Sequence, residues 1–137
     1  MKITWPLTGR QSVIIDDENW PIYANVYNVT GTTEPTSESR WQVLVRRHLD
    51  GRALILTNYE FDDSDGADED CINQTRGTLL DDDLMHVIDI LSMDAIINAI
   101  YELCEEISIT RHHGQDAERW PDLAEDCIAE LPALTLE

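Results

Sequence analysis

The chain has 137 residues, of which 28 are acidic and nine are Lys or Arg, so its formal net charge at pH 7 is -19. This length suits a single domain over residues 1–137, and a hydrophobic fraction of 42% is enough for a packed core. The charge excludes direct binding of nucleic acid through a basic surface, because neutralising phosphates requires many Lys and Arg side chains.

Targeting signals and cysteine usage both indicate the cytoplasm. Residues 1–6 lack the apolar stretch of a secretory signal, and the chain has no run of about 18 apolar residues for a membrane span. The three cysteines, Cys71, Cys104 and Cys127, are an odd number without CxxC spacing, which argues against a disulfide framework and a zinc knuckle. We therefore expect a cytoplasmic protein with reduced thiols and no contact with a membrane.

The negative charge is confined to the second part of the chain. Residues 1–52 contain six acidic and six basic side chains, so their charges cancel. Residues 53–137 contain the other 22 acidic side chains and only three arginines. The entire net charge therefore belongs to residues 53–137.

The first half of the chain has the alternating pattern of β-strands. Residues 12–15 are a short apolar run that ends at the acidic turn 16–19, and residues 20–29 alternate between apolar and polar side chains. Residues 31–39 are rich in Thr, Ser and Glu and lack apolar anchors. We expect strands followed by a mobile loop over residues 31–39.

The clearest local signal is the dipeptide Asp50-Gly51 between two apolar runs. Asp-Gly favours positive φ at both positions and therefore predicts a two-residue type I′ hairpin. Pairing outward from that turn predicts three pairs of partners: Arg47 with Leu54, Arg46 with Ile55, and Val45 with Leu56. The prediction gathers Arg46, Arg47 and Arg52 near one end of the hairpin.

The second half of the chain is polar at first and then helical. Residues 62–78 predict a loop, whereas residues 79–91 fit either a turn before a short helix or a strand over 84–90. From Ser92, a predicted N-cap, apolar side chains recur at helical spacing to a predicted end near Ser108. The predicted apolar face consists of Met93, Ile96, Ile97, Ile100, Leu103, Cys104 and Ile107.

A second helix is expected from Trp120 or Pro121 to Leu131, because proline suits the first helical turn and Pro132 ends the pattern. Its predicted apolar face consists of Leu123, Ala124, Cys127, Ile128 and Leu131. These elements predict an α+β fold, in which an N-terminal antiparallel sheet of four or five strands carries two C-terminal helices on one face.

Four segments carry a family resemblance. They are Leu7-Thr8-Gly9-Arg10, Trp20-Pro21-Ile22, the run from Trp41 to Arg52, and the run from Asp126 to Pro132. On these segments the chain resembles an uncharacterised family of small bacterial and prophage proteins. The resemblance implies a prophage or mobile-element origin, a setting in which inhibitors of host defence such as anti-CRISPR proteins are often found. It brings no catalytic residues, because its motifs are structural.

Metal and catalytic chemistry have weak support in the sequence. The acidic segment 62–70 suggests calcium, but an EF-hand pattern would have Phe61 and Ile72 at its first and twelfth ligand positions. His112-His113 lack the spacing of a metal site, and no Gly-x-Ser-x-Gly elbow or phosphate-binding glycine loop occurs. We therefore expect no enzyme activity, no catalytic or metal-binding residues and no cofactor.

Four carboxylates recur at intervals of four residues: Glu118, Asp122, Asp126 and Glu130. On a helix this spacing forms a column with about 6 Å between neighbours along the axis. Each like-charge pair costs about 0.2–0.5 kcal/mol, so three pairs cost on the order of 1 kcal/mol. Such a column resembles a line of phosphates, which duplex DNA carries at one per about 1.7 Å of axis. An ordinary solvated helix face is the alternative interpretation.

The distribution of charge favours a non-enzymatic interaction protein. We expect its anionic surface to bind a basic protein of a nucleic-acid-binding complex and to occupy the nucleic-acid site, as a prophage-encoded, anti-CRISPR-like inhibitor would. The predicted partner-binding residues are Asp62, Asp63, Asp65, Asp68, Glu69, Asp70, Asp81, Asp82, Asp83, Asp122, Asp126 and Glu130.

Two other functions share part of this evidence. In a self-associating structural or accessory phage protein, Trp5, Trp20, Trp41 and a face with Tyr23 and Tyr27 would form a homodimer contact, and the acidic residues would maintain solubility. An immunity protein that neutralises a basic nuclease toxin would use the same electrostatics as the inhibitor.

Overall fold

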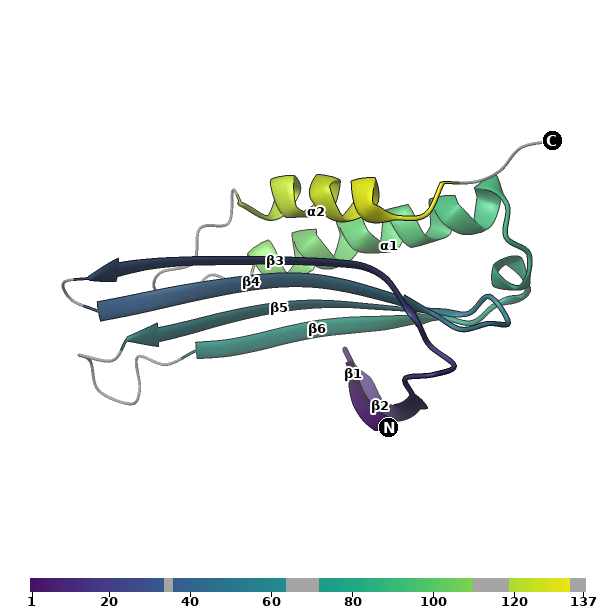
Figure 1. Cartoon of the computed structure of the whole chain (residues 1–137), viewed down its shortest axis with the longest axis horizontal. Helices are drawn as coiled ribbons and strands as arrows, with labels where there is room; N and C mark the ends of the chain where they lie inside the picture. Colours follow the sequence, from purple (N-terminus) through teal and green to yellow (C-terminus); the bar gives the residue numbers. More distant parts are fainter. Residues whose placement is uncertain (34–35, 64–71, 110–118, 134–137) are drawn as a thin grey trace.

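The computed structural model describes residues 1–33, 36–63, 72–109 and 119–133, and its strands precede its two α-helices (Figure 1). The elements in chain order are β1 (Lys2–Leu7), β2 (Arg10–Asp16), β3 (Ile22–Thr33), β4 (Thr36–Arg47), β5 (Ala53–Asp63), β6 (Ile72–Leu80), the 3-10 helix η2 (Asp83–His86), α1 (Ile90–Ile109) and α2 (Arg119–Glu130). The predicted α+β class is confirmed.

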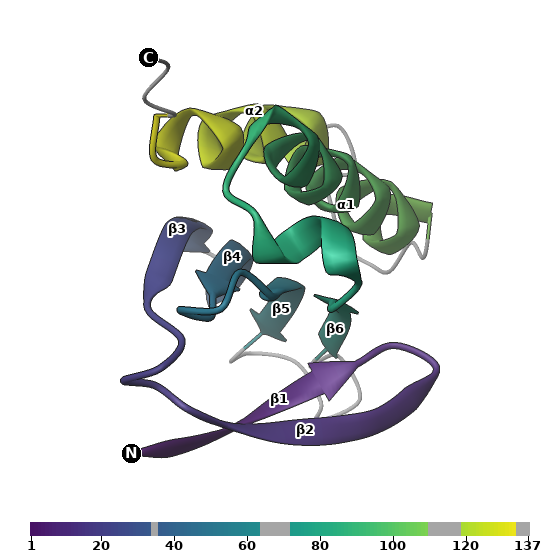
Figure 2. The same cartoon turned by 90° about the vertical axis from the view of Figure 1, so that its right-hand side faces the viewer.

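The strands divide between two antiparallel sheets. Strands β3 to β6 pair in chain order as a four-stranded sheet, and β1 pairs with β2 as a separate two-stranded sheet. The helices cover one face of the four-stranded sheet, and the β1–β2 hairpin lies against the other face (Figure 2). The molecule therefore has three layers.

The main core lies between the four-stranded sheet and the helices. Alternate residues of β4 and β5 face the helices, because successive side chains of a strand point to opposite faces. The buried residues from this sheet face include Trp41, Val43, Val45, Ile55 and Tyr59. They pack against Ile96, Ile100, Leu103 and Ile107 of α1 and against Trp120, Leu123 and Cys127 of α2. Burying each large apolar side chain contributes about 1.5–3 kcal/mol, so this contact fixes the helices on the sheet.

A smaller core joins the β1–β2 hairpin to the other face of the sheet. Trp5, Leu7, Ile15 and Trp20 pack around Leu54 of β5. At the edge strand β6, the Thr8 amide donates to the Gly77 carbonyl and the Gly77 amide donates to Thr8 Oγ1, each at 2.9 Å. A Cβ at Gly77 would lie 2.0 Å from the Pro6 carbonyl oxygen, so this contact requires glycine.

The turn between β4 and β5 differs from the predicted type I′ hairpin. The Gly51 amide donates to the His48 carbonyl at 2.9 Å, and Gly51 has a φ of 106°, whereas no non-glycine residue in the described part of the chain has a positive φ. These features match a type I turn followed by a left-handed glycine, the three-residue hairpin loop that Asp-Gly also fits. The register consequently shifts by one residue, and Arg47 pairs with Ala53.

Arg47 lies on the helix-covered face of the sheet, because alternate residues of a strand share a face and Val43 and Val45 face the helices. The shift gives it Ala53 in place of Leu54 as its partner. Arg47 is 1% exposed, whereas Arg46 donates to the Trp20 carbonyl and Arg52 pairs with Asp50. The three arginines lie near the same end of the hairpin, as predicted, and Arg46 and Arg52 both contact Trp20, whereas Arg47 is buried on the opposite face.

Two predicted loops are partly strand. Residues 31–33 and 36–39 belong to β3 and β4, and the predicted loop over 62–78 contains the end of β5 and most of β6. Polar strands form here because each has a hydrogen-bonded neighbour, which satisfies the backbone whatever the side chains are. Residues 34–35 and 64–71 lie outside the described part of the chain.

The ambiguous segment 79–91 contains no strand over 84–90. Strand β6 ends at Leu80, η2 follows, and α1 begins at Ile90. The N-cap is Asp89 and not the predicted Ser92: Asp89 Oδ1 accepts the Ser92 amide at 2.9 Å, and Ser92 Oγ accepts the Asp89 amide at 3.2 Å. This reciprocal pair is a capping box with serine in the position that Glu or Gln usually occupies.

Candidate functional site

The outward surface of α1 and α2 is strongly acidic. The two helices contain eight carboxylates and a single basic residue, Arg119. The Arg119 guanidinium carbon lies 4.8 Å from the centre of the Trp41 ring, and Nη1 donates to Asn28 Oδ1 at 3.3 Å. Arg119 is thus directed toward the sheet. The eight carboxylates all belong to exposed residues: Asp94, Glu102, Glu105, Glu106, Asp122, Glu125, Asp126 and Glu130. They occupy more than one side of the helices, since Glu102 and Glu106 line a hollow with Gly77 and Leu80 on the flank of α1 toward β6. We call the eight exposed carboxylates together the acidic helical layer.

The predicted column of carboxylates lies partly on α2. Asp122, Asp126 and Glu130 belong to this helix and are exposed, whereas Glu118 lies outside the described residues. Glu130 Oε1 accepts the backbone amide of Asn25 at 3.1 Å, which holds this carboxylate at the edge strand β3. Neighbouring members are about 6 Å apart along the axis, so their repulsion in water is less than 1 kcal/mol per pair.

The other predicted partner-binding residues do not join this column. Asp81, Asp82 and Asp83 are exposed between β6 and α1, at the end of the molecule that carries the β4–β5 turn (Figure 1). Asp62 and Asp63 are the last residues of β5, at the opposite end of the sheet. The nine residues of β6 separate the two groups by roughly 26 Å. The remaining predicted residues, Asp65, Asp68, Glu69 and Asp70, lie outside the described part of the chain.

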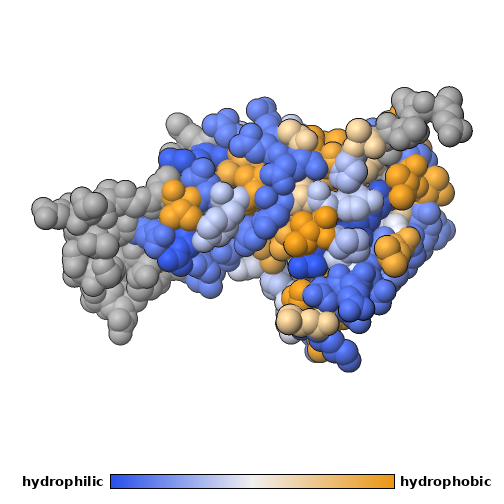
Figure 3. All heavy atoms as spheres, in the orientation of Figure 1, coloured by the Kyte–Doolittle hydropathy of each residue, from blue (hydrophilic) through white to orange (hydrophobic). Residues whose placement is uncertain are grey.

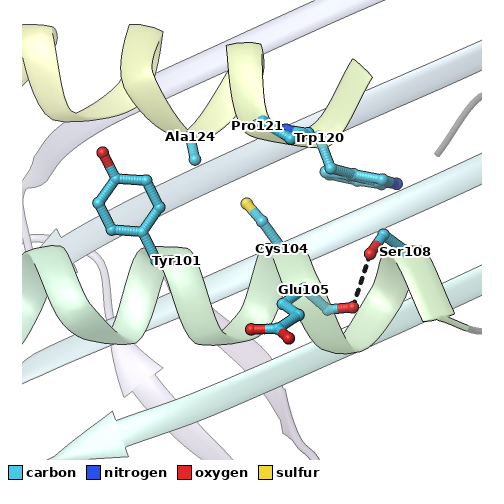
Figure 4. A pocket seen from close by; sticks show the side chains of 7 residues that line it. All are labelled: Tyr101, Cys104, Glu105, Ser108, Trp120, Pro121 and Ala124. Carbon is cyan, nitrogen blue, oxygen red and sulfur yellow. Dashed lines mark hydrogen bonds between the residues drawn. The ribbon is translucent and has the colours of Figure 1, made fainter. Parts of the chain in front are cut away.

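Two hollows follow the outer seam between α1 and α2. Each has a volume of about 280 Å³. Figure 4 shows the residues that line the first hollow, and the second lies nearer the start of α1. The first is lined by Tyr101, Cys104, Glu105, Ser108, Trp120, Pro121 and Ala124. The second is lined by Ile90, Met93, Asp94, Ile97, Ile128, Leu131 and Pro132. We call the two hollows together the interhelical groove.

The hydrophilic surface of the molecule in Figure 3 is interrupted by exposed hydrophobic residues, several of them toward the end with the β4–β5 turn.

The interhelical groove was not among the features predicted from the sequence. One sign of the groove is present in the sequence: the apolar faces of the two helices are wider than the stripe that packs on the sheet. Ile97 is half-buried and Tyr101 is 46% exposed, although both follow the helical period of the core residues. Only the positions of the two helices side by side show that these residues meet Ala124 and Ile128 across a seam.

The groove has no activated nucleophile among its described residues. Burial raises the pKa of Cys104 to about 12 and, for the same reason, that of Cys127 to about 12, so both thiols stay protonated at neutral pH. Ser108 Oγ donates to the Glu105 carbonyl at 2.7 Å, and the Glu105 carboxylate points away from Cys104 (Figure 4). Protonated buried thiols are poor nucleophiles. The groove is therefore suited to binding apolar side chains.

The predicted homodimer contact through tryptophans is wrong. Trp5, Trp20 and Trp41 are 2%, 6% and 2% exposed, because the first two fill the smaller core and Trp41 fills the main core. Tyr23 is half-buried, and Tyr27 is 56% exposed on the sheet face that the helices do not cover. These residues do not form a common surface.

No group of three His, Cys, Asp or Glu side chains in the described ranges is arranged to hold a metal ion. Most of the acidic segment 62–70 and the pair His112-His113 lie outside those ranges. Neither described α-helix is long and apolar enough to cross a membrane.

Comparison of the chain with family models, with curated proteins and with solved structures finds no match. The resemblance to small bacterial and prophage proteins therefore stays a prediction. The acidic helical layer and the interhelical groove are the two features of the described residues that bear on function.

Proposed function

We propose that the protein is a non-enzymatic inhibitor that binds a basic, nucleic-acid-binding protein through the acidic helical layer and blocks its nucleic-acid site. A prophage-encoded inhibitor that acts in the host cytoplasm, as anti-CRISPR proteins do, is the concrete form of this proposal. The observation that carries it is the concentration of eight exposed carboxylates on two adjacent helices whose only basic side chain is directed toward the sheet.

Competitive occupation is the mechanism that this surface supports. A site for nucleic acid holds phosphates with Lys and Arg side chains, and the carboxylates of Asp122, Asp126 and their neighbours present the same sign of charge on a rigid scaffold. Complementary charge accelerates encounter and selects partners, and its effect decreases as salt is added. The inhibitor would therefore compete best at low ionic strength.

The arrangement of charge on α2 also has a cost for the fold. Asp126 has a carboxylate four residues away on each side, and each such pair costs about 0.2–0.5 kcal/mol. A surface that retains such repulsion is consistent with selection for binding.

An immunity protein against a basic nuclease toxin would use the same layer, and an adjacent toxin gene would identify that case. Self-association through the tryptophans is not supported, because Trp5, Trp20 and Trp41 are all buried within the chain.

A competition experiment tests the proposal. A pull-down from host lysate is carried out at about 50 and about 200 mM salt, and mass spectrometry identifies the partner. The purified partner is then bound to a labelled nucleic acid. The wild-type protein should displace the nucleic acid, and less effectively at the higher salt concentration.

Matched variants make the competition specific to the helices. The variant Asp122→Asn/Glu125→Gln/Asp126→Asn should displace much less, whereas Asp16→Asn/Asp17→Asn/Glu18→Gln, which removes equal charge beside the β1–β2 hairpin, should act as wild type. Binding of the partner without displacement of nucleic acid, or equal loss in both variants, would contradict the proposal.

A further inference from the structure

The interhelical groove is an apolar seam that the fold leaves uncovered. Ile90, Ile97, Tyr101 and Ser108 line it from α1 at spacings of seven, four and seven residues, which place them on one side of the helix. Ile90 is 55% exposed and Tyr101 is 46% exposed. Exposed apolar groups gathered in a groove between helices are typical of a protein-binding surface.

The groove has carboxylates along its side. Asp94 lines the second hollow and Glu105 lines the first, both from α1. On α2, Glu125 is exposed and directly follows the groove residue Ala124. An occupant with positive charge beside its apolar contacts is therefore favoured.

A second copy of this chain does not fit this requirement. It would bring its own Asp94 and Glu105 against the same row and would add a second net charge of -19. Like charges facing each other across an interface oppose association. The favoured occupant is a basic partner.

We propose that the interhelical groove binds one amphipathic α-helix of a basic partner, with its apolar side chains in the two hollows and its Lys and Arg side chains beside Asp94, Glu105 and Glu125. This inference rests on the proposed function for the kind of partner and adds the form of the segment that is recognised. Helices commonly bind in this manner, through anchors at helical spacing in an apolar groove.

The length of the groove sets the length of this segment. From Ile90 to Ser108, α1 rises about 27 Å, which an occupant of about 18 helical residues spans. The α1 residues that line the two hollows are centred about 11 residues apart, or about 16 Å along the axis. The occupant should therefore carry its bulky apolar anchors about 11 residues apart.

Two peptides of identical composition test the groove with the full-length protein. The first is a helical peptide of about 18 residues, the length of the groove. It has Leu at the positions that face the groove and Lys and Arg beside them. The second has the same residues in a scrambled order without an apolar stripe. We expect the first peptide to bind about tenfold more tightly in fluorescence anisotropy, because a few buried anchors supply most of the binding energy.

Single substitutions locate the site. Tyr101→Ser should weaken binding of the first peptide about fivefold or more. Tyr27→Ser, at a tyrosine that is 56% exposed on the sheet face away from the helices, should leave the affinity unchanged. Glu105→Gln should weaken binding at low salt, with Glu18→Gln as its control. Far-UV circular dichroism checks that each variant is folded.

The outcomes separate this inference from the proposed function. Equal affinity of the two peptides would overturn the groove inference, and the acidic helical layer would still stand as a charged surface. A dimer that Tyr101→Ser dissociates in sedimentation would overturn it in favour of a second copy. Failure of the proposed function would instead appear as a partner whose nucleic acid is not displaced, whatever the peptides do.

Discussion

Replacement of the buried arginine, Arg47→Met, should strongly destabilise the fold. Arg47 Nε donates to the Gly51 carbonyl at 2.8 Å, and Nη2 donates to the Met85 carbonyl at 3.1 Å and to Ser92 Oγ at 3.2 Å. These bonds connect the β4–β5 turn, η2 and the first turn of α1. Nη1 also donates to Met93 Sδ at 3.6 Å, and the guanidinium carbon lies 5.8 Å from the centre of the Tyr23 ring. Among the described residues Arg47 forms no ion pair with a carboxylate, so neutral groups hold its charge.

The expected loss of stability follows from the acceptors that remain. Methionine fills most of the volume but leaves the carbonyl oxygens of the buried residues Gly51 and Met85 without this donor. Each unsatisfied buried acceptor costs about 1–3 kcal/mol, and removal of a buried charge offsets part of the total. We expect the free energy of unfolding to fall by about 2–4 kcal/mol.

Urea unfolding monitored by tryptophan fluorescence measures this loss. With an m-value of about 2 kcal/mol/M, the midpoint should fall by about 1–2 M. Arg10→Met, at an exposed position of β2, is the control and should leave the midpoint almost unchanged. An Arg47→Met protein with the midpoint of wild type would refute the reasoning, because the buried guanidinium would then make no net contribution.

Three further predictions concern other contacts. Gly77→Ala should destabilise the protein by about 1–3 kcal/mol in the same urea assay, since its Cβ would collide with the Pro6 carbonyl and displace β1; an unchanged midpoint would mean that the hairpin adjusts freely. Desolvation raises the pKa of Asp50, but hydrogen bonds from the Arg52 side chain and amide outweigh it and lower the pKa to about 2. The folded-state pKa is thus below the unfolded value, so the stability that Asp50 contributes is present above about pH 4 and is lost toward pH 2. The difference in unfolding free energy between wild type and Asp50→Asn should therefore shrink in acid, and a difference that does not shrink would contradict this assignment. In a Cys71→Ser protein, Cys104 and Cys127 should not react with a thiol reagent at about pH 8 until urea unfolds the chain, because burial raises the pKa of each to about 12.

The helices were predictable because their burial is one-sided. Met93, Ile96, Ile100 and Leu103 face the sheet in the structure, as their spacing predicts. The start of α1 was displaced by three residues because Ser92 and Asp89 are both good capping residues. Their reciprocal hydrogen bonds, and not residue type alone, determine which of them is the N-cap.

The sheet was less predictable because its register depends on one turn. Asp50-Gly51 suits both a two-residue and a three-residue loop, and these loops pair Arg47 with Leu54 or with Ala53, whose side chains lie on opposite faces of the sheet. Strand β6 has few apolar residues, since hydrogen bonds to β5 and the contact at Gly77 hold it in place. Neither the pairing nor the close approach at Gly77 leaves a periodic signal in the sequence.

The candidate site was partly predictable in the same sense. The count of charges located the acidic surface in the second part of the chain, and Asp122 and Asp126 do share a helix face. The groove depends on two segments far apart in the sequence that pack side by side, which periodicity within one helix does not reveal.

Zero-length carbodiimide cross-linking of the complex tests the central claim most directly, because this chemistry joins a carboxylate to a lysine only when the two are in contact. Mass spectrometry should find the partner's lysines linked to Asp94, Glu105, Asp122, Glu125 or Asp126, and the links should disappear as salt dissociates the complex. Links confined to Asp16, Asp17, Glu18 or Glu60, on the β1–β2 hairpin and the sheet, would contradict a binding surface on the helices.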